Sequence, residues 1–393
     1  MYQPIRYALL KFTFSLCVYF KIFNSISMNK KKILLISPTG GNGGINSWTN
    51  KYLKTFIDDR FELISIDSSL KHRKFSEQSL LKRVYAGLLG LRFIRQQLIK
   101  EIQKNNISIM HITTSGSLGT VRDYCLAKIC IKHGIKTVMH CRYGCISQDL
   151  KAKFIWGYFF RKTLMLYNQI WVLDSYSEKS LKNIEILKDR VFLTPNSIDV
   201  PDTFCLSTKK INRVAFVGNL EPTKGLFELI QAVLKIDYDI KLFIVGPGAS
   251  NVIDKIKILA GVDLGHKIIL MGGMANEDVI NFMKTIDILV LPTYYKAEAF
   301  PISILEAMSL GKIVISTERA AIKDMLTGKN GNNCGLFVKE KSVDDIVDKI
   351  KYCIENHNEA ELLMKNAYNK VWESYRKEVV YDIYRLHYSS LIQ

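Results

Sequence analysis

Short apolar runs alternate with helical spacers along most of the chain, from residue 32 to residue 338. Apolar runs that are bounded by turn residues predict buried strands. A strand, a helix and a further strand in repetition are typical of a parallel α/β sheet. The predicted strands cover Lys32–Ser37, Ile109–Thr113, Thr137–His140, Gln169–Leu173, Arg213–Gly218, Lys241–Val245, Ile268–Met271, Ile286–Leu291 and Ile313–Ser316.

A polar stretch without periodicity, Val200–Asn212, separates these strands into two series and is the predicted linker. The length of 393 residues allows two or three domains of ordinary size. We expect an N-terminal extension at residues 1–30, a first α/β domain at 31–205, a second α/β domain at 213–370 and a C-terminal helix at 371–393.

The stretch Leu291–Ser316 carries the most specific chemistry, because it places Glu298 in a loop after a buried strand and Glu306 in the helix that follows. In an open parallel sheet, such loops bind ligands, and the free N–H groups at a helix N-terminus attract anions. Apolar residues surround Glu306 in the sequence, where a carboxylate is costly unless a group such as a sugar hydroxyl hydrogen-bonds it.

This stretch resembles the signature of the retaining GT-B glycosyltransferases of the family 4 type, or glycosyl transferases group 1. The features that carry the resemblance are the strand, the E-x7-E spacing across the loop and helix, the pair Phe300-Pro301, and the Gly-Lys-Ile-Val that follows. The resemblance begins at Lys32 and is strongest from Val214 to Val338. It implies an α/β fold of two Rossmann-like, doubly wound domains that face a central cleft, with the last helix crossing back to the first domain. It also implies sugar transfer from a nucleotide-diphosphate sugar to a hydroxyl, with retention and without an obligatory metal or cofactor.

The resemblance also implies a role for particular residues. Glu298 would hold hydroxyls of the donor sugar, Glu306 the ribose, and His140 the sugar from the opposite wall. Backbone near Gly272 would meet the base, and Lys224 would bind the diphosphate together with N–H groups of the Phe300–Ile302 segment. The expected catalytic residues are therefore Glu298 and His140, and the expected donor-binding residues are Gly218, Asn219, Lys224, Gly272, Phe300, Pro301, Ile302 and Glu306.

One donor-binding position departs from the family pattern. Asn219 stands where the family usually has an arginine, so this position can donate a hydrogen bond but brings no charge. The diphosphate is then expected to depend more on Lys224 and on helix N-termini. Taken alone, Lys224 could equally be a surface lysine, and His140 could equally be a buried interior histidine. The position of Arg142 suits binding of either a phosphate or the acceptor.

A glycine loop follows the first predicted strand. It does not complete the G-x-G-x-x-G pattern of dinucleotide sites, because Asn46 occupies the last glycine position, and it lacks the Gly-Lys-Ser/Thr ending of a P-loop. The resemblance implies that Gly43 and Gly44 border the cleft; an ordinary tight turn is the alternative.

The composition narrows the class of protein. A hydrophobic content of 48% argues against disorder, and eight cysteines without a C-x-x-C motif favour the reduced thiols of a cytosolic protein. Neighbouring cysteines and histidines lack the spacing of a zinc finger, so we expect no metal site. They are Cys125, Cys130, His133, His140, Cys141 and Cys145.

The net charge of +18 indicates an anionic partner. No nucleic-acid-binding motif is present, so a nucleotide sugar and a glycan or lipid-linked acceptor are the expected partners. Residues 71–104 form a basic amphipathic pattern that suits either an anionic membrane or a helix with a solvated face. Residues 7–23 are apolar but contain Lys11 and Lys21, which leaves too short a run to span a bilayer. That extension is either an interfacial anchor or dispensable.

Together with the basic composition, the resemblance implies a cytoplasmic glycosyltransferase, with or without peripheral attachment to the inner face of the membrane, that acts in surface polysaccharide biosynthesis. Two alternatives stay open at this point. One is a nucleotide-sugar epimerase of the same fold, which needs no acceptor. The other is a catalytically weak protein that binds sugar nucleotides, which the residue Asn219 would favour.

Overall fold

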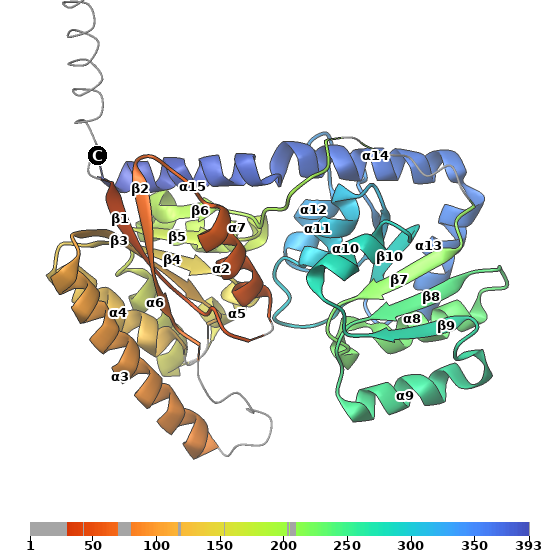
Figure 1. Ribbon diagram of the computed structural model, residues 1–393, viewed down its shortest axis with the longest axis horizontal. Coiled ribbons are helices and arrows are strands. Elements are labelled where there is room, and N and C mark those ends of the chain that lie inside the picture. Colours follow the sequence, from red (N-terminus) through yellow and green to blue (C-terminus); the bar gives the residue numbers. More distant parts are fainter. Residues whose placement is uncertain are drawn as a thin grey trace, which may run out of the picture.

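A computed structural model describes residues 30–41, 43–69, 80–116, 119–152, 154–202, 204 and 210–392 of the chain. The predicted N-terminal extension up to residue 29, residues 71–79 of the basic stretch, and residues 203 and 205–209 of the predicted linker lie outside the described residues. Two six-stranded sheets with helices packed around them build the described part (Figure 1). Every strand pairing is parallel, which confirms the predicted doubly wound α/β fold.

The first sheet has the strand order β2-β1-β3-β4-β5-β6. The order reverses between β1 and β3, and in doubly wound sheets ligands bind at the carboxyl ends of the strands beside such a switch point. The strands are β1 (Lys31–Ser37), β2 (Phe61–Asp67), β3 (Ile107–Thr114), β4 (Lys136–Cys141), β5 (Gln169–Val172) and β6 (Val191–Leu193). The helices are α2 (Gly44–Thr55), α3 (Leu80–Lys104), α4 (Gly119–Lys132), α5 (Ile146–Lys151), α6 (Phe154–Leu164), α7 (Ser175–Lys182) and the 3₁₀ helix η2 (Glu185–Arg190).

The second sheet has the strand order β12-β11-β10-β7-β8-β9, and its switch point lies between β7 and β10. The strands are β7 (Arg213–Val217), β8 (Lys241–Val245), β9 (Ile268–Gly272), β10 (Ile288–Leu291), β11 (Ile313–Ser316) and β12 (Leu336–Phe337). The helices are α8 (Leu226–Lys235), α9 (Ser250–Ala260), α10 (Asn276–Met283), α11 (Ile302–Ser309), α12 (Ala321–Leu326), α13 (Val343–Glu355) and α14 (His357–Ser374), with the 3₁₀ helices η3 (Pro222–Lys224) and η4 (Gly261–Asp263).

The central strands are mainly apolar and buried because helices cover both faces of each sheet. All four residues of β5, β10 and β11 are buried. Each sheet therefore has its own hydrophobic core. The sheets act as two rigid supports, and the loops at their carboxyl ends are free to carry function.

The last helix returns to the first sheet. Helix α14 packs its apolar residues into the core of the second sheet, whereas α15 (Lys377–Ile392) buries Tyr381, Tyr384 and Tyr388 against the first. Figure 1 shows the two helices following one another along one side of the molecule, across both sheets. The rings of Tyr384 and Trp171 have centroids 4.9 Å apart, which joins the end of the chain to strand β5.

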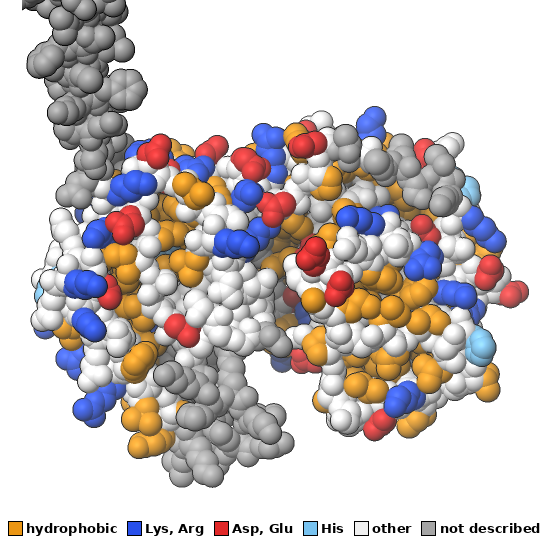
Figure 2. Space-filling view, viewed as in Figure 1, with side chains coloured by type: hydrophobic (Ala, Val, Ile, Leu, Met, Phe, Trp, Pro, Cys, Tyr) orange, Lys and Arg blue, Asp and Glu red, His pale blue; other side chains and the backbone are white. Residues whose placement is uncertain are grey.

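Within the residues that the structure describes, no helix is both long and apolar enough to cross a bilayer. Helix α3 nevertheless exposes several large apolar side chains near its N-terminal half, and Figure 2 shows hydrophobic and basic side chains side by side in this region, at the lower left. They are Tyr85, Leu88, Leu89 and Phe93.

We expect Tyr384→Ala to lower the free energy of unfolding by about 3–5 kcal/mol, because a fully buried aromatic side chain is removed from a packed core. Chemical unfolding followed by tryptophan fluorescence would measure the change, since Trp48 and Trp171 lie in the same cluster. The matched control is Leu386→Ala on the same helix, where a side chain that is 67% exposed should contribute within about 0.5 kcal/mol. Equal effects of the two substitutions would contradict the docking of α15.

Candidate functional site

The loops at the carboxyl ends of the two sheets meet at a cavity of about 280 Å³. Residues from both sheets line it, so the site exists only when the two units are together. Its lining comprises Gly44, Ile45, Arg142, Leu173 and Asn196 from the first sheet and its loops, and Val217, Gly218, Lys224, Leu291 and the segment Ala297–Ser303 from the second.

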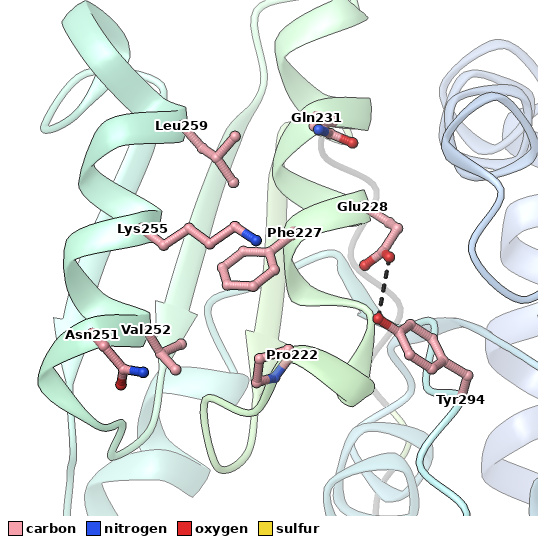
Figure 3. A pocket seen from close by; sticks show the side chains of 9 residues that line it. All are labelled: Pro222, Phe227, Glu228, Gln231, Asn251, Val252, Lys255, Leu259 and Tyr294. Carbon is pink, nitrogen blue, oxygen red and sulfur yellow. Dashed lines mark hydrogen bonds between the residues drawn. The ribbon is translucent and has the colours of Figure 1, made fainter.

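A larger cavity of about 500 Å³ lies between α8 and α9. Figure 3 shows the ammonium group of Lys255 beside the ring of Phe227, at 4.2 Å from its centroid, and Tyr294 donating to Glu228 at 3.3 Å. This cavity is lined by the second unit alone and contains none of the residues predicted for the site. We therefore take the smaller cavity between the two sheets as the candidate site.

Lys224 and Glu298 form the ionic centre of the site. The Nζ atom of Lys224 lies 2.5 Å from Oε2 of Glu298, to which the hydroxyl of Thr293 also donates at 3.2 Å. The close approach depends on Gly225, whose φ is +76° and where a Cβ atom would lie only 2.2 Å from the carbonyl oxygen of Pro292. In this structure, the charge of Lys224 is thus balanced by Glu298.

The N-terminus of α11 forms another wall of the site. Its N-cap is Pro301, and the first helical hydrogen bond runs from the N–H of Leu305 to the carbonyl of Pro301. The N–H groups of the preceding residues have no partner within the helix and point out of its N-terminus. Phe300, Pro301, Ile302 and Ser303 all line the cavity, so this end of α11 can receive an anion.

Glu306 lies one turn further along α11 and does not line the cavity. Its side chain is 7% exposed, and no described residue hydrogen-bonds its carboxylate. Burial raises its pKa to about 7, although the charge of Lys51 acts in the opposite direction. A buried carboxylate without a partner suits a ligand that donates hydrogen bonds, such as the hydroxyls of a ribose, and this role stays a prediction.

The first unit holds the Glu298 loop directly. A Cβ atom at Gly144 would lie 1.7 Å from the carbonyl oxygen of Glu298, so only glycine permits this contact. The thiol of Cys145 donates to the carbonyl of Lys296 at 2.9 Å, and Nδ2 of Asn196 donates to the carbonyl of Phe300 at 3.2 Å. The position of the Glu298 loop is therefore set by contacts from the opposite unit.

His140 lies behind the wall of the cavity rather than in it. The ring is completely buried and does not line the cavity. Arg142, which does line it, is in contact with Nε2 of His140 through Nη1 at 3.2 Å. Since a guanidinium can only donate, Nε2 accepts and the proton of His140 is on Nδ1. The contact of His140 with the sugar stays a prediction, and in this structure the residue orients Arg142.

A chain of buried hydrogen bonds continues from His140 to the last helix. Nδ1 of His140 lies 3.2 Å from Nε2 of His111, and Nδ1 of His111 lies 2.5 Å from the hydroxyl of Tyr388. Tyr388 and Tyr52 are joined in turn at 3.1 Å. Burial, followed by the charge of Arg142, lowers the pKa of both histidines, that of His111 to about 3. Both rings are therefore neutral.

The predicted glycine positions are distributed unevenly around the site. Gly44 and Gly218 line the cavity, whereas Gly43 precedes α2 as its N-cap and Gly272 ends strand β9 outside the lining. Asn219 is exposed and does not line the cavity. Of the predicted residues, the structure thus gathers Glu298, Lys224, Gly44, Gly218 and the segment from Phe300 to Ile302 around one space.

Sequence reasoning missed Gly144, Cys145, Thr293 and Asn196. Asn196 follows a proline in a turn, and Gly144 is a single glycine between Tyr143 and Cys145, so neither belongs to a recognisable motif. Their importance arises from contacts between the two units. Arg142 was noted for its position alone.

Comparisons with known proteins find similarity to glycosyltransferases. Residues 206–370 match the family model described as glycosyl transferases group 1. An uncharacterized glycosyltransferase of Methanocaldococcus jannaschii is 27% identical, over 74% of this chain and 76% of that protein. The lipopolysaccharide 1,2-N-acetylglucosaminetransferase of Salmonella typhimurium is 28% identical, over 44% of this chain and 53% of that protein.

Solved structures share the fold. A sucrose-phosphate synthase from Thermosynechococcus elongatus has a TM-score of 0.70 at 14% identity, covering 92% of this chain and 99% of that one. HepE from Anabaena in complex with UDP-glucose has a TM-score of 0.67 at 16% identity, covering 91% and 99%. At these identities the likeness establishes the GT-B fold alone.

The raised pKa of Glu306 makes stability depend on pH. Because the pKa is about 7 in the folded protein against 4.5 for an ordinary glutamate, the folded state binds this proton more tightly. The resulting stabilisation is present below pH 4.5 and is lost as the pH rises to about 7. We expect Glu306→Gln to be more stable than the wild type by about 3 kcal/mol at pH 8 and by little at pH 5.

Urea unfolding of both proteins at the two pH values measures this difference. A Glu306→Gln effect that is the same at pH 5 and pH 8 would show that the carboxylate is not desolvated.

Proposed function

We propose that this chain, whose residues 206–370 match the model of glycosyl transferases group 1 within a GT-B fold, transfers a sugar from a nucleoside diphosphate sugar to a hydroxyl. The observation that supports the proposal most is the convergence of Lys224, Glu298 and the N-terminus of α11 on one cavity between two doubly wound units. A cation and free N–H groups suit a diphosphate, and a carboxylate beside them suits sugar hydroxyls.

Lys224 changes partner when the donor binds. In this structure it contacts Glu298, and the more highly charged diphosphate would attract it away from the carboxylate. Once Lys224 turns to the phosphate, the Glu298 carboxylate is free to accept hydrogen bonds from the sugar. When the bond to the sugar breaks, the negative charge that develops on the leaving diphosphate meets Lys224 and the N–H groups of α11, which are already in place.

Lys224 and the N–H groups of α11 can stabilise the leaving diphosphate without a metal. We therefore propose a metal-independent reaction with retention at the anomeric carbon. Retention fits the resemblance of the Glu298–Glu306 stretch to retaining enzymes.

For the acceptor, we propose a glycan or lipid-linked glycan in surface polysaccharide biosynthesis, on the cytoplasmic face of the membrane. The names of relatives support this class: one is the lipopolysaccharide N-acetylglucosaminetransferase and another is a putative teichuronic acid biosynthesis glycosyltransferase of Bacillus subtilis. Helix α3 would bring the first unit to the membrane, because it exposes apolar residues beside Arg92 and Arg95.

The donor can be identified by a thermal-shift screen of the wild-type chain with UDP-, GDP- and ADP-sugars. Binding to the folded state raises its stability by about 2.7 kcal/mol at a ligand concentration of 100 Kd. Formation of an epimer without any acceptor would instead favour an epimerase, and binding without transfer or hydrolysis would favour a sugar-nucleotide-binding protein.

We expect Glu298→Gln to reduce the rate of sugar transfer by about 10²-fold or more, because the amide can no longer balance Lys224 or accept equally from the sugar. Initial rates with the donor found in the screen would measure the loss. The control is Glu318→Gln, an exposed glutamate paired with Lys323 outside the cavity, which should keep the wild-type rate. Transfer by Glu298→Gln at the wild-type rate would refute the assignment of the site.

Attachment through α3 makes a separate prediction. Leu88 and Leu89 are 59% and 50% exposed, and replacing both by serine should weaken binding to phosphatidylglycerol vesicles by at least about 10-fold, since apolar area no longer enters the interface. Vesicle co-sedimentation is the measurement, with Leu386→Ser on α15 as the control. A wild-type chain that stays in the supernatant would rule out this attachment.

A further inference from the structure

Arg142 is a buried cation without a counterion. Its side chain is 6% exposed, and among the described residues no carboxylate forms an ion pair with it. Burying an unpaired charge is costly, so such a group is kept only where something compensates it. The groups around it are neutral: Trp48, His140, Asn196 and Tyr384.

These neutral neighbours fix the guanidinium in one place. It stacks on the ring of Trp48 at 4.1 Å, while its Nη atoms donate to His140 and Asn196. The backbone N–H of Arg142 donates to the carbonyl of Thr114 at 2.9 Å, which anchors the residue to strand β3. The Nε–H group is buried and has no partner among the described residues. Arg142 thus retains both its charge and an unused donor.

The fixed guanidinium lines the same cavity as Lys224 and the N-terminus of α11. Arg142 and Lys224 are the two cationic residues among the described residues that line it, and they come from opposite units. Lys224 is already paired with Glu298, whereas Arg142 is not paired with any carboxylate in the described chain. An anion that enters the cavity would therefore be stabilised most by the unpaired charge of Arg142.

We propose that Arg142 binds the diphosphate of the sugar-nucleotide donor, so that the first unit supplies a guanidinium to a donor held mainly by the second. This inference rests on the proposed function. It makes the donor a link between the two units, with Arg142 on one side and Lys224 on the other. His140 and Asn196 then act as positioning residues, since each holds one arm of the guanidinium.

Calorimetric titration of UDP and GDP into the full chain, without acceptor, tests the proposal. Arg142→Gln should weaken binding of the nucleoside diphosphate by about 10- to 100-fold, the value of a charge-assisted hydrogen bond. Arg142→Lys should lose less, because it keeps the charge and loses the planar fork. Inorganic pyrophosphate should compete with the nucleotide less effectively for Arg142→Gln than for the wild type.

The matched control is Arg190→Gln, whose side chain donates to the carbonyls of Met165 and Tyr167 outside the cavity and whose loss should leave the affinity unchanged. If Arg142→Gln binds the nucleoside diphosphate with wild-type affinity, the inference is overturned and the proposed function stands. The same conclusion follows if Arg142→Gln raises only the KM for the acceptor. If Arg142→Gln does not fold, equal affinities of Arg142→Lys and wild type overturn it. A wild-type chain that binds neither nucleotide nor pyrophosphate would overturn both proposals.

Discussion

The loop that carries Glu298 is held between two units that fold around separate cores, and the function of the chain depends on this constraint. On one side, Gly225 brings η3 against Pro292 and so places Lys224 beside Glu298. On the other side, Gly144 lies against the carbonyl of Glu298, at a distance that excludes any side chain. Neither unit alone defines the position of the carboxylate. A site built in this way is complete only when the units are together, which links the chemistry to the relative position of the two sheets.

The buried polar chain from Tyr52 to Arg142 shows how the first unit prepares its side of the cavity. A guanidinium can only donate, so its presence at one end determines the direction of each hydrogen bond through His140 and His111 to Tyr388. Because both histidines are buried and neutral, the chain holds Arg142 without balancing its charge. The last helix takes part in this arrangement, since Tyr388 is one of its residues. The end of the sequence therefore supports a site formed mainly by residues far earlier in the chain.

Features that depend on neighbouring residues in the sequence could be predicted, whereas features that depend on contacts between distant segments could not. Strands β10 and β11 were predicted to within two residues because buried strands leave a continuous apolar run, whereas β2, a half-exposed edge strand, leaves no such run and was not predicted. Glu298 and Lys224 were found through local motifs, and the structure brings them into contact. Gly144 and Asn196 could not be found in the same way, because their contacts cross between units. The sequence placed His140 at the end of a strand, but only packing shows that Arg142, rather than His140, reaches the cavity wall.

The chain passes between the two units at two places, and these places are joined to each other. The N–H of Ile198 donates to the carbonyl of Tyr375 at 3.0 Å, and the N–H of Lys377 donates back to the carbonyl of Ile198 at 3.0 Å. Asp199 lies between Lys51 and Lys377 and strengthens the same junction with two ion pairs. Away from this junction, Asp324 of α12 accepts from the N–H and the hydroxyl of Ser175 on α7, while Cys145 and Asn196 donate to the backbone of the Glu298 loop. Because both chain crossings meet at one junction, a small rotation there would change the separation of groups on the two sides of the cleft. An anion bound between Arg142 and Lys224 would oppose that rotation, and so the donor itself would hold the units in the position that the reaction needs.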